Sequence, residues 1–560
     1  MRHPLICGIT LWVVTWFVCA LPSNAQTIMG EVRTNIMLRV EMLETGVPLS
    51  VEGDRIRSLT ALPRFYYLRA FQPAWSDRFG PVRFVHSLIK AIHDATQEGL
   101  QPRDYHLTAI EGIFGRMLND QKGKQWTDPA LLADFDILLT DAFLTYASHL
   151  LFGRVDPETF ERQWEHPRAE EDLARVLRDA LVSGRIEAAL QDLTPRDAGY
   201  TRLREALGQY RDIAAAGGWP MVPFVPKTRN REDRGAVVPL VNRLVISGDL
   251  RQNIYDSEVP FDAILAQAIR AFQARHGLTP DGVLGPVTLK ALNVSADERV
   301  RQIELNMERW RWLPRDLGDP CIIVNIADFR ARVFEGDRAV LEMRVVVGKD
   351  YRQTPVFSGT MERLVFSPYW YIPQKIAVED KLPLILRDPN YLVREHIDAF
   401  QWGNNGWLKE VDPNTIDWHM ADPNTFPYKL RQEPGPWNPL GRIKFIFPNK
   451  YAVYLHDTPS QELFEKAPRT FSSGCIRIEK PIELAEFLLQ ADPRWTRERI
   501  LSAASSDTEQ TVRLPCPVQV HIQYWTAWAN EDLGMEFRKD IYGSDRLLDQ
   551  ALSRQPPAPE

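Results

Sequence analysis

Residues 453–481 read VYLHDTPSQELFEKAPRTFSSGCIRIEKP, and this stretch decides which fold and which chemistry the chain is expected to have. His456 lies at the end of a predicted strand. Cys475 follows in the run SSGCIR, just before a predicted helix that Pro481 can start, since proline favours the first helical position. The stretch therefore predicts a strand-rich domain with a histidine and a cysteine as candidate reactive groups.

Alternating apolar residues continue the strand pattern on both sides of this stretch. The run from Ile322 to Val347 alternates on either side of a turn at residues 335–337, which is typical of a β-hairpin. The chain is therefore expected to end in a mainly β domain. The other predicted elements of this domain are strands at 361–367, 443–447, 451–456 and 517–525 and a helix at about 481–490.

Residues 371–441 interrupt the strand pattern and are rich in proline and tryptophan. Segments of this length inside a compact domain are usually functional lids or disordered, and the aromatic content argues against disorder. Each single tryptophan is expected first to pack in a core. Since both ends of the insert return to the β domain, we predict that it caps the active site, with its tryptophans as a wall over the substrate.

The chain before the β domain is predicted to be helical. Residues from about 30 to 215 carry apolar side chains at helical spacing and show no metal-ligand spacing, phosphate-binding loop or catalytic cluster. A packed helical scaffold explains these residues best. A linker rich in glycine, proline and charge follows at 217–234, and residues 296–313 are expected to form one helix that leads into the β domain.

Length and composition limit the class of protein. The 560 residues allow about three or four domains, and 44% hydrophobic with 25% charged residues is ordinary globular composition. A formal charge of −7 argues against a nucleic-acid-binding protein, which usually carries a basic surplus. A total of 5 cysteines is too few for a disulfide scaffold.

The N-terminus carries the pattern of a secretory signal peptide. An apolar run from Leu5 to Leu21 is followed by small residues ahead of a cut after Ala25. An N-terminal membrane anchor is the alternative, but the run is short for a membrane span. We therefore expect cleavage near Ala25 and a periplasmic or secreted mature protein.

The expected mature chain keeps Cys321, Cys475 and Cys516. An odd number of cysteines in an oxidising compartment leaves at least one thiol free, and a free thiol is a candidate for chemistry. Cys321 and Cys516 either form a disulfide as sheet neighbours or remain buried, inert thiols. The second reading is preferred because free cysteine packs well as a small apolar residue. We expect three free thiols, with only Cys475 reactive.

The residues around Cys475 are of the types that thiol catalysis needs. His456 can take the thiol proton and hold the pair as thiolate and imidazolium. Gly474 allows a tight turn, so that the N–H groups of Gly474 and Cys475 can point at a developing oxyanion. Arg477 can lower the thiol pKa or bind a substrate carboxylate. Tyr454 shares a strand face with His456 and either adds a donor near the oxyanion or packs as an aromatic residue.

Spacing alone leaves a second reading open, in which Cys475 is a buried, inert cysteine beside an unrelated histidine. The wider sequence bears on this choice. Residues 268–293 read AIRAFQARHGLTPDGVLGPVTLKALN and resemble the peptidoglycan-binding domain of secreted cell-wall enzymes. The positions that carry this resemblance are Phe272-Gln273, His276-Gly277-Leu278, Asp281-Gly282 and Gly285.

The segment around Cys475 resembles the L,D-transpeptidase catalytic domain, whose signature is a histidine, a spacer and then Ser-x-Gly-Cys-x-Arg or Asn. The texts PGPWNPLGRIKFIFPN, residues 434–449, and VYLHDTP match the large, lid-bearing subfamily. Many members carry a second histidine before the glycine, where this chain has Ser473, so His456 is the only base expected. The matching signature residues are His456, Ser472, Gly474, Cys475 and Arg477.

The resemblance implies a multidomain fold with an α-helical scaffold, a small helical peptidoglycan-binding module and a mainly β catalytic domain with a lid insert. The implied division is a signal peptide at 1–25, the scaffold at 26–235, the module at 236–296, a linker helix at 297–319, the catalytic domain at 320–545 with its lid at 371–441, and a tail at 546–560.

The resemblance also implies a mechanism without a metal or organic cofactor. Cys475 would attack the third residue of a tetrapeptide stem of peptidoglycan, and the terminal D-alanine would leave with a proton from His456. The thioester would then react with the side-chain amine of a second stem's diamino acid, giving a 3→3 cross-link. Arg477, Ser472, Ser473 and Tyr454 would contact the substrate, although the two serines could instead hydrogen-bond the turn.

The implied partner is peptidoglycan, together with other cell-wall enzymes, and nucleic acid is not expected. The implied role is in cell-wall organisation and cell shape, with carbapenems as inhibitors. Two alternatives stay open. Water could resolve the thioester, which would make the chain an L,D-carboxypeptidase, or the chain could be a catalytically inactive glycan-binding scaffold.

Overall fold

The computed structural model describes residues 23–77, 80–119, 128–160, 171–223, 234–251, 261–403, 407–421, 425–532 and 534–554. Most of the predicted signal peptide lies outside these residues, and the first described helix, α1, begins at Ser23. Among the helices in the described ranges, none combines the length and the apolar character needed to cross a membrane.

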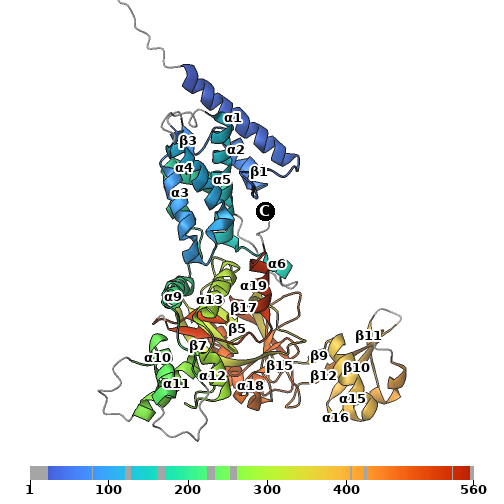
Figure 1. Ribbon diagram of the computed structural model, residues 1–560. Helices are drawn as coiled ribbons and strands as arrows, with labels where there is room; N and C mark the ends of the chain where they lie inside the picture. The colour runs from blue at the N-terminus through green and yellow to red at the C-terminus, as the bar shows by residue number, and fades with distance from the viewer. Residues whose placement is uncertain are drawn as a thin grey trace, which may run out of the picture.

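The N-terminal part is a helical bundle that stands on the β domain (Figure 1). The helix α5 is buried almost throughout and packs against α1, α3, α4 and α7. Asp128 caps its N-terminus through two backbone N–H groups, and Pro129 is its first residue. The bundle consists of α1 (Ser23–Glu44), α2 (Ala61–Leu68), α3 (Phe84–His93), α4 (Leu107–Asn119), α5 (Pro129–Phe152), α7 (Leu173–Ser183), α8 (Ile186–Gln191) and α9 (Ala198–Ala215).

The predicted small helical module is present as α10 (Arg234–Ile246), α11 (Phe261–Arg275) and α12 (Pro286–Leu292). Leu244, Phe272 and Leu292 are fully buried between these helices. The buried side chain of Gln273 donates to Asp281 at 2.8 Å and accepts from the Gly282 N–H at 2.8 Å, so it fixes the turn between α11 and α12.

Helix α13 (Ala296–Arg311) joins this module to the β domain and packs against α9. Ser295 and Glu298 form a capping box that starts it where the sequence predicts the linker helix. Its buried Glu308 accepts from the Arg154 N–H and pairs with Arg311 at 3.0 Å. The helix therefore ties the scaffold to the rest of the molecule through buried polar contacts as well as through apolar packing.

The β domain is a nine-stranded sheet in the order β15-β7-β16-β14-β13-β8-β17-β5-β6. Because β6 also pairs with β7, the strands from β7 to β6 close into a ring around an apolar core. The strands are β5 (Cys321–Asn325), β6 (Arg330–Glu335), β7 (Arg338–Gly348), β8 (Phe357–Phe366), β13 (Ile443–Ile446), β14 (Leu455–His456), β15 (Thr470–Ser472), β16 (Ile476–Ile478) and β17 (Gln510–Gln523).

Several predicted strand boundaries differ from the structure, and β8 and β17 begin earlier than predicted, at Phe357 and Gln510. The alternation predicted as one hairpin is the three strands β5, β6 and β7. The strand predicted at 451–456 begins only at Leu455, because the Asn449 side chain accepts from the Tyr451 and Val453 N–H groups and holds a turn there. The helix predicted at about 481–490 is α17 (Pro481–Leu489).

The insert folds as a subdomain of its own rather than as a long loop. Its sheet has the order β11-β10-β12-β9 and is covered by α15 (Leu382–Arg387) and α16 (Tyr391–Arg394) around a separate apolar core. The subdomain projects to one side of the β domain (Figure 1). Its strands are β9 (Trp370–Ile372), β10 (Ile397–Trp402), β11 (Leu408–Val411) and β12 (Tyr428–Gln432).

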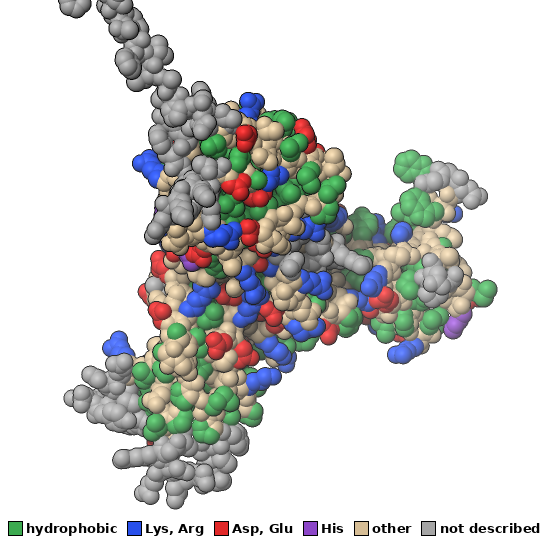
Figure 2. All heavy atoms as spheres, turned by 45° about the horizontal axis from the view of Figure 1, so that its top comes forward, with side chains coloured by type: hydrophobic (Ala, Val, Ile, Leu, Met, Phe, Trp, Pro, Cys, Tyr) green, Lys and Arg blue, Asp and Glu red, His purple; other side chains and the backbone are tan. Residues whose placement is uncertain are grey.

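The tryptophans of the insert divide between core and surface. Trp370 and Trp418 are buried, whereas Trp402 and Trp407 are 59% and 76% exposed. Hydrophobic side chains gather over this outlying lobe (Figure 2). The expectation that each tryptophan packs in a core is therefore wrong for the last two, and the capping role of the insert stays a prediction.

The C-terminal residues are more structured than a tail. The short strands β18 (Ala527–Ala529) and β19 (Met535–Phe537) precede α19 (Ser544–Leu552), whose Leu548 is fully buried in the core of the β domain. The boundary placed at residue 545 therefore cuts through a helix that belongs to the packed β domain.

Candidate active site

Three neighbouring strands bring the predicted reactive residues together. Lys444 on β13 lies opposite His456 on β14, and His456 lies opposite Arg477 on β16. Directly paired residues point to the same face of a sheet, so these three side chains share one face. The other face carries Phe445, Leu455 and Ile476, which are fully buried in the core. The apolar face anchors the strands, and the polar face is left for chemistry.

Tyr454 and Cys475 complete this polar face. Tyr454 precedes His456 by two residues, and the Ile476 N–H donates to its carbonyl at 3.1 Å, which aligns Cys475 beside Tyr454. Burial and the neighbouring Cys475 raise the pKa of Tyr454. The Tyr454 and His456 rings meet edge to face with centroids 5.7 Å apart. Tyr454 thus packs as an aromatic residue beside Cys475, and its role as a donor near the oxyanion stays a prediction.

The hydrogen bonding of His456 leaves one ring nitrogen available as a base. Its Nδ1 lies 2.5 Å from the carbonyl oxygen of Asp457. A carbonyl can only accept, so Nδ1 carries the proton and Nε2 is the unprotonated, basic nitrogen. Burial, together with the positive charges of Arg477 and Lys444, lowers the pKa of His456 to about 3. The imidazole is therefore neutral at physiological pH.

The thiol of Cys475 is also held in its neutral form. Burial raises its pKa, and the hydrogen bonds with Tyr454 only partly oppose this effect. The thiol lies 3.8 Å from the carbonyl oxygen of Ala452. The resting pair is therefore a thiol beside a neutral imidazole, which differs from the thiolate–imidazolium pair expected from the sequence. The physical reason is that burial penalises both charged forms.

The turn before Cys475 is held by Ser472 and Gly474. The Ser472 hydroxyl donates to the Cys475 carbonyl at 2.5 Å and accepts from the Gly474 N–H at 3.1 Å. Gly474 has φ +117°, a conformation that residues with a side chain rarely adopt. Ser472 therefore holds the turn instead of facing the substrate, and the Gly474 N–H, expected to point at an oxyanion, is used within the turn.

Ser473 contacts the insert through an arginine that the sequence did not single out. The hydroxyl of exposed Ser473 accepts from Arg352 Nη1 at 2.9 Å. The same guanidinium pairs with Glu379 at 2.5 Å and with Asp380 at 2.6 Å, both in the short π-helical turn η4 (Ala377–Lys381) of the insert. A continuous polar chain therefore connects the insert to the residue two positions before Cys475.

Arg477 and Lys444 supply positive charge beside the thiol. The Nε of Arg477 is buried and has no hydrogen-bond partner among the described residues. Burial lowers the pKa of Arg477, while the neighbouring Cys475 acts to raise it. The Lys444 ammonium lies 3.9 Å from the centre of the Tyr454 ring. An incompletely paired guanidinium beside the nucleophile is suited to a substrate carboxylate.

Lys444 and Arg352 are the site residues that sequence reasoning missed. Lys444 is the only charged residue in β13, which is a weak signal that this position faces away from the core. Its place opposite His456 depends on strand register. Arg352 reaches partners 27, 28 and 121 residues away, and no local pattern predicts contacts at such separations.

All three cysteines of the described chain are free thiols, as expected. Cys321 is buried, but Cys516 is exposed, so the expectation that both are buried is wrong. Cys321 pairs in register with Gln519, and Cys516 lies where the pairing of β17 with β8 is irregular, so that its side chain faces solvent. In the described ranges, no group of three or more His, Cys, Asp or Glu residues is arranged to hold a metal ion.

Comparison with known proteins gives three family matches along the chain. Residues 319–499 match the L,D-transpeptidase catalytic domain, residues 60–207 match the Scaffold domain, and residues 236–292 match a family described as "Putative peptidoglycan binding domain". A protein from Haemophilus influenzae named "Putative L,D-transpeptidase" is 37% identical over 253 residues.

The aligned residues are 45% of this chain and 49% of that relative, so the chain spans about half the length of the relative. The three matches follow the domain order expected from the sequence, and the multidomain fold class is confirmed. Residues 319–499 are therefore similar to the L,D-transpeptidase catalytic domain, and the relative that the chain matches carries the same family name.

Proposed function

We propose that this chain forms 3→3 cross-links in peptidoglycan through a thioester on Cys475. The observation that carries the proposal is the common sheet face of Cys475, His456 and Arg477, where a thiol, a neutral base and an incompletely paired guanidinium lie together. This combination provides a nucleophile, a proton acceptor and a group that can hold a substrate carboxylate.

In the first step, the Cys475 sulfur attacks the carbonyl carbon of the third residue in a tetrapeptide stem. The S–C bond forms while the thiol proton moves to Nε2 of His456, because the resting thiol is protonated. The carbonyl oxygen becomes an oxyanion, for which the Tyr454 hydroxyl is the proposed side-chain donor. The bond to the terminal D-alanine then breaks, and the leaving nitrogen takes the proton from His456.

In the second step, the side-chain amine of a diamino acid in another stem attacks the thioester carbonyl. His456 takes a proton from the amine, the C–S bond breaks, and the sulfur of Cys475 recovers a proton from the imidazolium. The product is an amide between two third-position residues. Both proposed steps involve only side chains of this protein and groups of the two substrate stems.

The wider proposal follows from the same chemistry. The mature protein acts in the periplasm or outside the cell after cleavage near Ala25, and residues 236–296 hold the enzyme on peptidoglycan. Its product contributes to cell-wall organisation and cell shape, and carbapenems inhibit it by acylating Cys475. The apolar run before Ala25 and the match of residues 236–292 support this assignment.

The test is a carbapenem trapping experiment followed by intact-protein mass spectrometry. The native protein is expected to gain one carbapenem mass, located on the peptide that contains Cys475. The Cys475→Ala variant is the control, and it should gain none while keeping the native melting temperature. An absence of adduct on the native protein would favour the inactive scaffold and contradict the proposal.

A further inference from the structure

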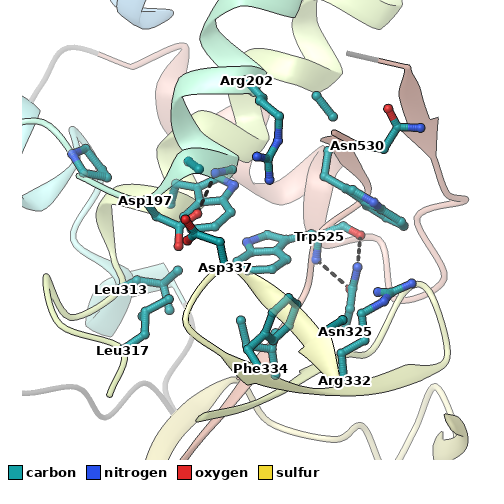
Figure 3. Close-up of a pocket in the computed structure, with 18 of the residues that line it drawn as sticks. Asp197, Arg202, Leu313, Leu317, Asn325, Arg332, Phe334, Asp337, Trp525 and Asn530 are labelled. Carbon is teal, nitrogen blue, oxygen red and sulfur yellow. Dashed lines mark hydrogen bonds between the residues drawn. The ribbon is translucent and has the colours of Figure 1, made fainter. Parts of the chain in front are cut away.

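A cavity of about 1020 Å³ lies at the junction of the scaffold, the small helical module and the β domain, and none of the catalytic residues line it (Figure 3). One wall is the outer face of β5 and β6, where Ile323 lies opposite Arg332. The inner face of the same strands carries Val324 and Val333 in the core of the β domain. The sheet therefore separates the cavity from the apolar core of the β domain.

The centre of the cavity is aromatic and fixed in position. Trp310 of α13 and Trp525 stack with ring centroids 4.5 Å apart and planes 15° from parallel. Asn325 holds the backbone of Trp525 by two hydrogen bonds of 3.0 Å each. Phe334 of β6 lies beside Trp525 (Figure 3). Trp310 and Trp525 are almost completely buried, so the partly exposed Phe334 offers the aromatic surface that a ligand can reach, and a ring held on a rigid wall binds at low entropic cost.

Polar groups of both signs surround this aromatic centre. The carboxylates of Asp197 and Asp337 lie side by side, and the Arg202 side chain reaches toward them (Figure 3). Asp197 is fixed by a bond of 2.6 Å from the Gly199 N–H. The Nε of Arg202 is buried with no hydrogen-bond partner among the described residues. Within those residues, neither Arg202 nor Asp337 forms an ion pair, so both keep capacity for a ligand.

This mixture of groups restricts the class of ligand. A strongly anionic ligand would meet the paired carboxylates Asp197 and Asp337, and a strongly cationic ligand would meet Arg202. A neutral ligand with many hydroxyl and amide groups can donate to the carboxylates, accept from the guanidinium and contact the partly exposed ring of Phe334. The volume of about 1020 Å³ lies at the upper end of the usual range for ligand sites, which leaves room for more than one sugar ring.

We propose that this cavity binds a segment of glycan built from N-acetylated amino sugars, the polysaccharide part of peptidoglycan. The inference rests on the proposed function, because that function makes peptidoglycan the substrate. Ala271, Ala274 and Arg275 of α11 also line the cavity, so a glycan strand on the small module can continue into it. The cavity then holds the glycan while a stem peptide from the same polymer reaches Cys475.

The test measures glycan binding by the full mature chain with Cys475→Ala, which prevents turnover. The probe is chitotetraose, a peptide-free tetramer of N-acetylglucosamine, titrated by calorimetry and by tryptophan fluorescence. Each of the added variants Arg202→Ala and Asp337→Ala is expected to raise the Kd by about tenfold, the effect of losing a hydrogen bond with a charged group. Arg178→Ala is the matched control, since Arg178 pairs with Asp179 on the scaffold surface at 2.8 Å.

Two outcomes would overturn the inference. One is an equal Kd in all variants or no chitotetraose binding at all. The other is binding of a free stem peptide, but not of chitotetraose, that weakens with Arg202→Ala. Carbapenem acylation of Cys475 is measured in parallel on the active protein with and without Arg202→Ala, and an unchanged rate is expected. Failure of acylation in the unmodified protein would instead contradict the proposed function, and the glycan titration would still decide the role of the cavity.

Discussion

At the scale of the residue, burial sets the protonation states of the two reactive side chains. His456 has a pKa lowered to about 3, and the pKa of Cys475 is raised. In the proposed mechanism, the thiol proton therefore moves during attack rather than before it, with His456 as a general base that starts from its neutral form. The proposed mechanism uses the nearby positive charges of Arg477 and Lys444 to stabilise the negative charge that develops on sulfur and oxygen.

This state predicts a flat pH profile for acylation. The rate of carbapenem acylation should change little between about pH 5 and 8, because neither His456 nor Cys475 changes its resting protonation state in this window. Stopped-flow fluorescence of the native protein measures it. His456→Gln should lower the rate by about 10²-fold across the same window, as expected for a lost general base. A sigmoidal rise centred near the ordinary histidine pKa of about 6.5 would show that an ion pair forms first.

The stability of the scaffold is expected to depend on pH through His106, in contrast to the flat pH profile expected for acylation. Burial alone would lower its pKa, but hydrogen bonds with Asp141 at 2.7 Å and Asp54 at 3.1 Å raise it to about 9. A group with a raised folded pKa stabilises fully below its unfolded value, and this stabilisation is lost as pH rises through the folded value. Thermal melts of His106→Gln should therefore differ most from the native protein below about pH 6.5.

The difference in melting temperature between the native protein and His106→Gln should shrink as pH rises through about 9. His93→Gln is the control, because its partner Glu111 lies on the surface and the pair is mostly exposed. A constant difference for His106→Gln at all pH values would mean that this side chain contributes by packing alone.

At the scale of the element, the insert and the nucleophile turn are joined through one guanidinium. Arg352 pairs with Glu379 and Asp380 of η4 and donates to Ser473. Its own loop is fixed to the turn, because the Thr354 hydroxyl donates to the Gly474 carbonyl at 2.9 Å. Polar contacts therefore connect the insert to the turn that positions Cys475, and we expect this link to couple the two.

Removal of this link should slow acylation without unfolding the protein. Arg352→Ala is expected to lower the acylation rate by about tenfold, since three charge-assisted hydrogen-bonded contacts are lost at the site entrance. Arg352→Lys should recover part of the rate because it keeps the charge but not the forked geometry. Stopped-flow acylation and melting temperature are measured together.

Arg394→Ala serves as the control for the insert, since Arg394 pairs with Asp388 on the exposed surface of the same subdomain. Its acylation rate should equal that of the native protein. If Arg352→Ala reacts as fast as the native protein, the insert is not coupled to the nucleophile through this residue.

Features that depend on local sequence signals could be predicted, whereas contacts between distant parts of the chain could not. The alternation around Val345, the glycine before Cys475 and the proline at the start of α17 are local signals, and each produced the expected element. The opposition of Lys444 and His456 depends on which strand becomes the neighbour of which, and the contacts of Arg352 cross a separate subdomain. Local patterns contain neither kind of information, so these residues were missed.

At the scale of the whole molecule, α13 holds the domains together. Glu308 accepts from the N–H groups of Arg154 and Val155 at 2.5 and 2.8 Å and pairs with Arg311. Both Glu308 and Arg311 are almost completely buried. The same helix contributes Trp310 to the aromatic centre of the cavity. The domain order was predictable from motifs, whereas this shared polar centre arises only where the domains meet.

This arrangement predicts a large loss of stability on substitution of one buried carboxylate. Glu308→Ala leaves Arg311 as a buried charge without its partner, which should cost about 3–5 kcal/mol in the free energy of unfolding. Chemical denaturation measures the loss. Glu187→Ala is the control, because the Lys90–Glu187 pair is exposed, and its effect should stay within about 0.5 kcal/mol. Equal stability of Glu308→Ala and the native protein would contradict the central role of α13.

The central claim is the transfer of a stem peptide through Cys475, and one reaction tests it most directly. Purified disaccharide-tetrapeptide is incubated with the native protein and with Cys475→Ala, and the products are read by mass spectrometry. The account predicts a dimer that has lost one D-alanine, with a bond between third residues established by fragmentation, and no product from the variant. A tripeptide product alone would show that water resolves the thioester, as in an L,D-carboxypeptidase. Cross-linked dimer from Cys475→Ala at the native rate would contradict the account.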